Sequence, residues 1–147
     1  MDMLTGLRSK DNKEAYRLLL LLEEESERCS DLYGCLDDFL SLLRDESSLV
    51  RTRGFRLACA QARWDREGRL EKNLDALLSM LDDEKATAVR QCLPALRQVI
   101  LYLPELKATV KKKLEEMDFS KYKESMVPLL QKDVDQLWKW MEGDIEK

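Results

Sequence analysis

Apolar residues recur along this chain at the three- and four-residue spacing of amphipathic helices, and short polar segments interrupt the pattern. In the first such segment, about residues 11–29, Ala15, Leu19 and Leu22 fall on one side of the helix that the pattern predicts. The pattern restarts near residues 31, 48, 70, 85, 104 and 121, and no segment shows the two-residue alternation of a half-buried strand. The sequence therefore predicts an all-α chain of about seven antiparallel helices.

Two segments of the chain are near copies of each other. Residues 36–51 read LDDFLSLLRDESSLVR, and residues 74–90 read LDALLSMLDDEKATAVR. A weaker third copy follows, because QCLPALRQV at 91–99 matches SMVPLLQKD at 125–133. Repeats of this length indicate stacked helix pairs that share one core. We therefore expect a right-handed α-solenoid in a single domain that spans residues 1–147.

The expected solenoid has a leading helix and three helix pairs. The leading helix covers about 11–29, the first repeat about 31–64, the second about 70–103 and a degenerate third about 104–142. Pro94 and Pro128 fall inside the second helices of the last two pairs, where we expect kinks. Gly54 shares one face of the helix at about 48–64 with other small residues, which predicts close approach of a neighbouring helix.

The turn aspartates and the Val-Arg pairs of the two copies resemble the HEAT repeat pattern, and the whole chain is similar to small stand-alone HEAT-like proteins of bacteria. In that family the turn Asp and the Arg after Val form a hydrogen-bonded ladder between repeats, which here implies Asp45, Arg51, Asp83 and Arg90. The resemblance implies a scaffold that binds proteins. One branch of HEAT-like folds removes alkylated bases from DNA, which implies nucleic-acid binding as an alternative.

Candidate catalytic chemistry is sparse in this sequence. There is no His, which is the commonest general base, and no Gly-rich phosphate loop. Four cysteines are present without a C-x-x-C pair, so we expect reduced thiols in a cytoplasmic protein and no metal site or other cofactor. The cysteines are Cys29, Cys35, Cys59 and Cys92. We therefore expect a protein that is not an enzyme.

The charge distribution adds one local feature. The net charge is −4, but residues 47–72 hold seven basic and three acidic side chains. Arg53, Arg56 and Arg63 fall on one side of the expected helix at 48–64, and Arg97 lies on the next repeat. These arginines either pair with neighbouring acids or line a groove that binds an anion. The longest apolar run, Leu18–Leu22, is too short to cross a bilayer, so no membrane association is expected.

Tryptophans offer apolar contacts beside these charges. Trp64 ends the basic helix, and we expect Trp138 in the core. Trp140 falls on the polar side of the last helix, where it either contacts a partner or caps the last repeat. We therefore expect a non-catalytic scaffold that binds a protein or peptide through Arg53, Arg56, Arg63, Trp64, Arg97 and Trp140. A structural subunit of a larger assembly is a further possibility.

Overall fold

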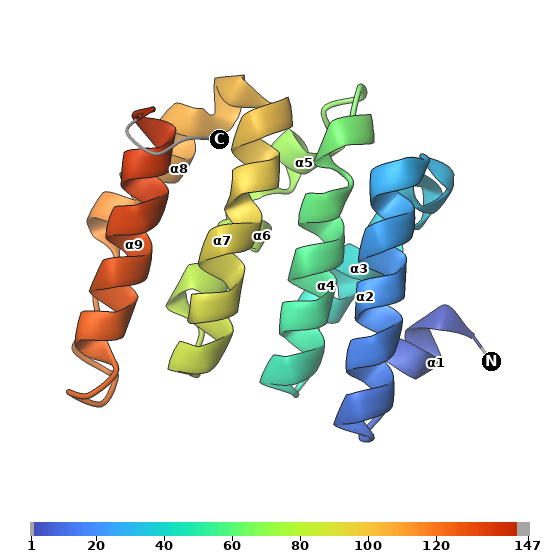
Figure 1. Cartoon of the computed structure of the whole chain (residues 1–147), viewed down its shortest axis with the longest axis horizontal. Coiled ribbons are helices and arrows are strands. Elements are labelled where there is room, and N and C mark those ends of the chain that lie inside the picture. Colours follow the sequence, from blue (N-terminus) through green and yellow to red (C-terminus); the bar gives the residue numbers. More distant parts are fainter. Residues whose placement is uncertain (1, 144–147) are drawn as a thin grey trace.

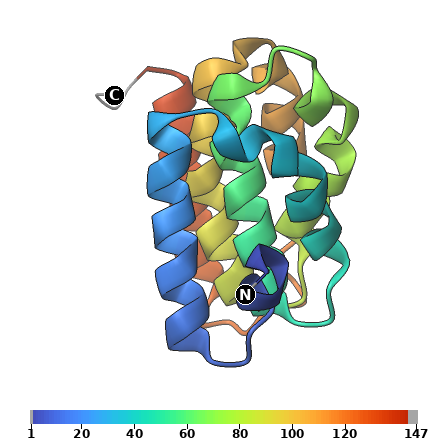
Figure 2. The same ribbon diagram turned by 90° about the vertical axis from the view of Figure 1, so that its right-hand side faces the viewer.

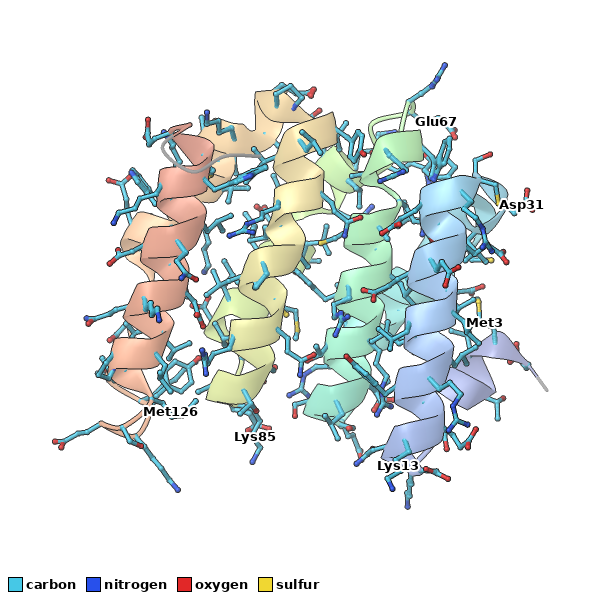
Figure 3. All side chains as sticks on the ribbon, in the orientation of Figure 1. Met3, Lys13, Asp31, Glu67, Lys85 and Met126 are labelled. Carbon is cyan, nitrogen blue, oxygen red and sulfur yellow. The ribbon has the colours of Figure 1, made fainter. Side chains whose placement is uncertain are left out.

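The computed structural model describes residues 2–143 as helices joined by short turns, without strands in that range. Four long helices lie side by side in one layer (Figure 1). They are α2 (Asn12–Arg28), α4 (Ser48–Ala60), α7 (Ala86–Tyr102) and α9 (Val127–Met141). Lys13, Lys85 and Met126 mark the starts of three of them at the same end of the layer, so these helices run in the same direction (Figure 3).

Shorter helices form a second layer against the first (Figure 2). They are α3 (Leu36–Ser41), α5 (Arg69–Lys72), α6 (Leu74–Leu78) and α8 (Lys107–Glu116). Together with α1 (Met3–Leu7), the described residues contain nine α-helices, where the sequence predicted about seven. The all-helical class is confirmed, and the leucines shared by the two sequence copies lie in the core or pack against it.

The short-helix layer is more broken than its leucine spacing predicts. Short 3-10 turns at Asp31–Cys35 and Leu42–Arg44 flank α3, and another at Ser79–Asp82 follows α6. The helix whose pattern begins near residue 70 is interrupted at Asn73, whose side chain donates a hydrogen bond to the carbonyl of Arg69 at 2.8 Å. Such a side-chain bond competes with the helical backbone pattern and favours a break.

The leading helix that the sequence predicts, α2, has a partner helix before it. Asp11 caps α2 by accepting a hydrogen bond from the backbone N–H of Glu14 at 3.2 Å. Helix α1 precedes it and packs against it, with Leu7 fully buried. The periodicity did not reveal α1 because five residues are too few to show a helical repeat.

Only one of the two prolines lies inside a helix, although the sequence predicted that both would. Pro94 lies inside α7, which continues through it. Pro128, by contrast, stands in the first turn of α9, because this helix begins at Val127 and not near residue 121. The prediction of an interior Pro128 is therefore wrong. Proline is well tolerated in the first turn, because a first-turn N–H has no helical acceptor to bind.

Gly54 lies where α4 approaches the short-helix layer most closely. A Cβ atom at this position would lie 2.6 Å from the Cβ of Leu42 and 2.6 Å from the carbonyl oxygen of Phe39. The close helix approach that the small residues of α4 predicted is therefore confirmed, and it positions α4 between its neighbours in the long-helix layer.

Arginine–aspartate pairs connect successive helix pairs. The side chain of Arg51 donates to Asp83 at 2.9 Å, as the repeat resemblance implies. Arg90 pairs with Asp133 of α9 at 2.6 Å and not with an acid in the preceding turn. Asp45 lies 3.7 Å from Arg8, beyond the end of α1. These ion pairs thus join segments that lie far apart in the sequence, although only one of them joins two of the expected ladder residues.

Candidate functional site

Arg53 is buried, with 5% of its surface exposed, so the expectation that it lies on an exposed basic face is wrong. Its Nη1 donates to the carbonyl of Leu7 at 2.8 Å, and its Nη2 donates to Oδ1 of Asn12 at 3.1 Å. The end of α1 and the start of α2 cover this part of α4, which the sequence pattern of α4 alone could not show. Burial also lowers the pKa of the Arg53 guanidinium.

Arg56 lies at the centre of the long-helix layer and has partners on both sides. It forms two hydrogen bonds with the carboxylate of Glu23 on α2, at 2.8 and 3.0 Å. Its Nη1 donates to Oε1 of Gln91 on α7 at 3.1 Å, and its guanidinium carbon lies 5.9 Å from the centre of the Tyr16 ring. This arginine therefore links three neighbouring helices.

Arg63 and Arg97 are stacked on aromatic rings. Arg63 lies 4.9 Å from the ring centre of Tyr102 and donates to the carbonyl of Glu27 at 2.8 Å. Arg97 lies 5.8 Å from the ring centre of Trp140. All four candidate arginines thus have contacts within the protein, so the structure favours internal pairing over a free basic stripe for phosphates.

The tryptophans are mostly engaged in packing. Trp140 is only 7% exposed, which corrects the expectation that it lies on a polar face, because Arg97 of α7 covers its ring. Trp138 is half-buried and packs against the core, with the Lys111 ammonium 5.1 Å from its ring centre. Trp64 donates from Nε1 to the carbonyl of Ser26 at 2.7 Å, which joins the end of α4 to α2.

The long helices carry two hollows on the side turned away from the short helices, which we call the outer face. The first hollow, about 300 Å³, is lined by residues of α2, α4 and α7, including Tyr16, Leu49 and Gln91. The second hollow, about 400 Å³, is lined by side chains that include Glu23, Arg56, Gln91 and Pro94. Gln91 borders both, so the two hollows are neighbours on the long helices.

Exposed apolar side chains lie on the same helices as these hollows, and Tyr16 and Leu49 line the first of them. Tyr16 is 50% exposed, and Leu20 and Leu49 are each 44% exposed. Leu20 follows Tyr16 by about one turn of α2, so the two lie on the same side of that helix. Sequence reasoning missed these residues, although their position on the otherwise polar side of α2 was a usable signal. The outer face therefore combines apolar contact with buried polar groups.

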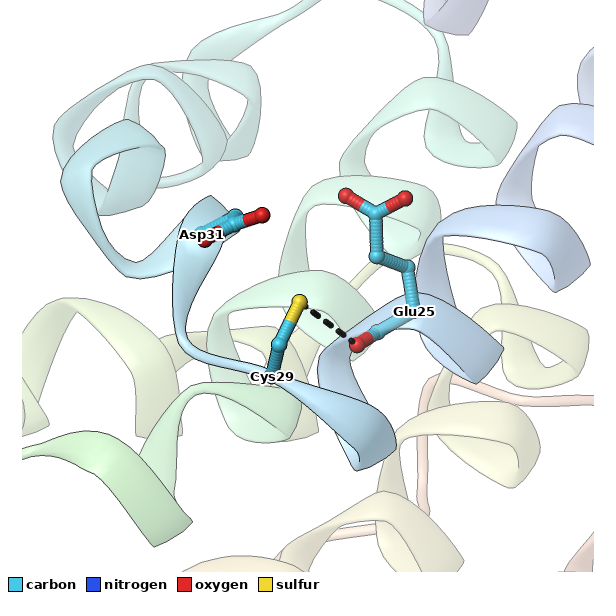
Figure 4. A group of neighbouring side chains, drawn as sticks. All are labelled: Glu25, Cys29 and Asp31. Carbon is cyan, nitrogen blue, oxygen red and sulfur yellow. Dashed lines mark hydrogen bonds between the residues drawn. The ribbon is translucent and has the colours of Figure 1, made fainter.

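A group of possible metal ligands lies at the end of α2 (Figure 4). One ligand atom from each of Glu25, Cys29 and Asp31 lies within 4.8 Å of the others. The Cys29 thiol donates to the carbonyl of Glu25 at 3.7 Å. The set mixes two hard carboxylates with one soft thiol, and we assign no function to it.

No helix within residues 2–143 is long and apolar enough to cross a membrane. Comparisons of the chain with known protein families, with curated proteins and with solved structures gave no match. A functional assignment therefore depends on the geometry of the outer face itself.

Proposed function

We propose that this protein is a non-catalytic scaffold whose outer face binds another protein or a peptide. The observation that carries the proposal is the pair of neighbouring hollows that share Gln91, with exposed Tyr16 and Leu49 in the first and Arg56 in the second. Partner surfaces bind where apolar anchors enter such depressions and polar groups fix their orientation.

The proposed architecture is a right-handed HEAT-like solenoid, with each long helix as the second member of a pair. The doubled sequence and the Arg51–Asp83 bridge support it, since both relate neighbouring helix pairs in the same way. In such an array the second helices supply one extended surface. Binding would then need no catalytic group and no cofactor.

Nucleic-acid binding receives less support from the contacts of the arginines. A protein that binds DNA through phosphates needs several basic side chains free to replace counterions. Here Arg56 is engaged by Glu23, and Arg63 and Arg97 are stacked on aromatic rings. We therefore expect no retention of duplex DNA at about 50 mM salt, where phosphate contacts are strong.

Substitutions that add charge to the outer face test the proposal. Leu20→Glu and Leu49→Glu change exposed side chains, and the matched control Ala76→Glu changes an exposed residue of α6 in the other layer. We expect both outer-face variants to reduce the recovery of a co-purifying protein about tenfold or more, since a buried unpaired charge is costly at an interface. Equal recovery with all three folded variants would refute outer-face binding.

A further inference from the structure

Among residues 2–143, Arg53 is the one arginine that is buried, and it has no acidic partner. Arg51, Arg56 and Arg69 each meet a carboxylate at 2.8–3.0 Å. By contrast, no carboxylate of residues 2–143 lies within 4.0 Å of the Arg53 nitrogens, and only the Leu7 carbonyl and the Asn12 amide accept from them. A buried cation without a counter-charge is unfavourable, so a carboxylate brought to it would be bound strongly.

Arg53 also lines the first hollow and can donate further hydrogen bonds into it. A guanidinium has five N–H groups, and the two bonds described use two of them. A second cation, Lys13, belongs to the same lining, which contains no acidic residue. The electrostatic character of the hollow is therefore positive.

The two amides in the lining each turn their oxygen toward an arginine. Oδ1 of Asn12 accepts from Arg53, and Oε1 of Gln91 accepts from Arg56. Their NH₂ groups remain as donors toward a ligand. The polar groups of the hollow thus favour an acceptor with a negative charge.

The remaining lining is mainly apolar, because the hydroxyl of Thr52 donates to the backbone carbonyl of Ser48. Leu19 is buried in its wall, and Leu49 and the ring of Tyr16 are exposed at its edge. A volume of about 300 Å³ is at the lower limit of pockets that bury small ligands. The hollow therefore suits a ligand that carries an apolar group directly beside its anionic group.

We propose that the first hollow binds the C-terminal residue of a partner protein, with its α-carboxylate at Arg53 and Lys13 and an apolar last side chain against Leu49. In a C-terminal residue the carboxylate and the side chain branch from one Cα, which matches a hollow of this size. A C-terminal residue has only one neighbour in its chain, so the partner needs to pass into the hollow and not out of it again. This inference rests on the proposed function and names the part of the partner that the outer face recognises.

N-acetyl-Gly-Leu and N-acetyl-Gly-Phe, each as the free acid and as the C-terminal amide, are suitable probes. Binding is followed by NMR on the intact protein, from the Nε–H resonance of Arg53 and the backbone amides around the hollow. We expect the free acids to shift these resonances and to bind about tenfold or more tightly than the amides, because a charge-assisted bond is lost in the amide. Equal affinity of acid and amide would overturn the role assigned to the carboxylate.

Two further probes, octanoate and inorganic phosphate, test whether the carboxylate must come from a peptide. If octanoate binds as tightly as the peptides, the hollow is a site for small apolar acids and the C-terminal assignment is wrong. If inorganic phosphate shifts the same resonances at equal concentration, the apolar requirement is wrong. We expect both to bind more weakly than the free-acid peptides.

A matched pair of variants separates charge from folding. Leu49→Glu and Leu49→Gln have nearly the same shape, so we expect only the Glu variant to weaken binding of the free acids relative to the amides. An equal effect on both forms would overturn the electrostatic argument. If no probe binds while Leu20→Glu still abolishes partner recovery, the C-terminal assignment fails and the proposed function stands.

Discussion

Gly54→Ala tests whether the close approach of α4 to the short-helix layer holds the array together. In an exposed helix, alanine is favoured over glycine by about 1 kcal/mol. Here the new methyl group would lie 2.6 Å from both the Leu42 Cβ and the Phe39 carbonyl oxygen, where ordinary carbon contacts need about 3.5–4.0 Å. Both atoms are close to the backbone, so the two helices must separate.

Forced overpacking costs about 1–3 kcal/mol, and the rigidity of this contact favours the upper end. After the gain in helix propensity is subtracted, we expect a net loss of about 2 kcal/mol for Gly54→Ala. That loss lowers Tm by about 4–8 °C in a chain of this size. Thermal unfolding followed by circular dichroism measures the shift.

Gly34→Ala is the matched control, because a Cβ at Gly34 has no heavy atom within 4 Å. We expect its Tm to stay within about 2 °C of the unsubstituted protein, as for most surface changes. A Gly54→Ala protein as stable as this control would refute the close packing of α3 and α4.

Three further predictions concern the core, the ladder and a half-buried phenol. Leu77→Ala should cost about 2–5 kcal/mol in urea unfolding, because Leu77 is fully buried; a loss below about 1 kcal/mol would contradict this. A double-mutant cycle of Arg51→Gln and Asp83→Asn should give a coupling of about 1 kcal/mol or more, whereas additive effects would exclude a ladder bridge. Burial and the nearby Asp65 carboxylate raise the pKa of Tyr33 to about 12. The neutral hydroxyl therefore stabilises the fold fully below about pH 10, which is the pKa of an unfolded tyrosine, and this stabilisation is lost as the pH rises toward 12. Tyr33→Phe should therefore lower Tm at pH 8 but not at pH 12, and a constant difference between the two proteins would contradict the assignment.

Periodicity was sufficient to predict the long helices, because their leucines repeat over several turns. The close contact at Gly54 was likewise evident from local residue types. The same signal was too short for α1, and it did not reveal the break at Asn73, where a side-chain hydrogen bond competes with the helix. Local pattern therefore predicted the helical class better than the bounds of its short helices.

The site was harder to predict, since it depends on contacts between distant segments. Arg53 shares a helical face with Arg56, yet the end of α1 buries only the former. Similarly, Trp140 is covered by a residue of α7 that lies far away in the sequence. Tyr16 and Gln91 border the same hollow although 75 positions separate them. No periodicity within one helix carries such information.

Site-specific photo-crosslinking tests the central claim most directly. A photoreactive phenylalanine analogue replaces Leu20 or Leu49 on the outer face, or Ala76 in the short-helix layer as the control. The account predicts that the same partner protein is crosslinked from Leu20 and Leu49, and that little or none is crosslinked from Ala76. Crosslinking that is equal from both layers, or strongest from Ala76, would contradict binding at the outer face.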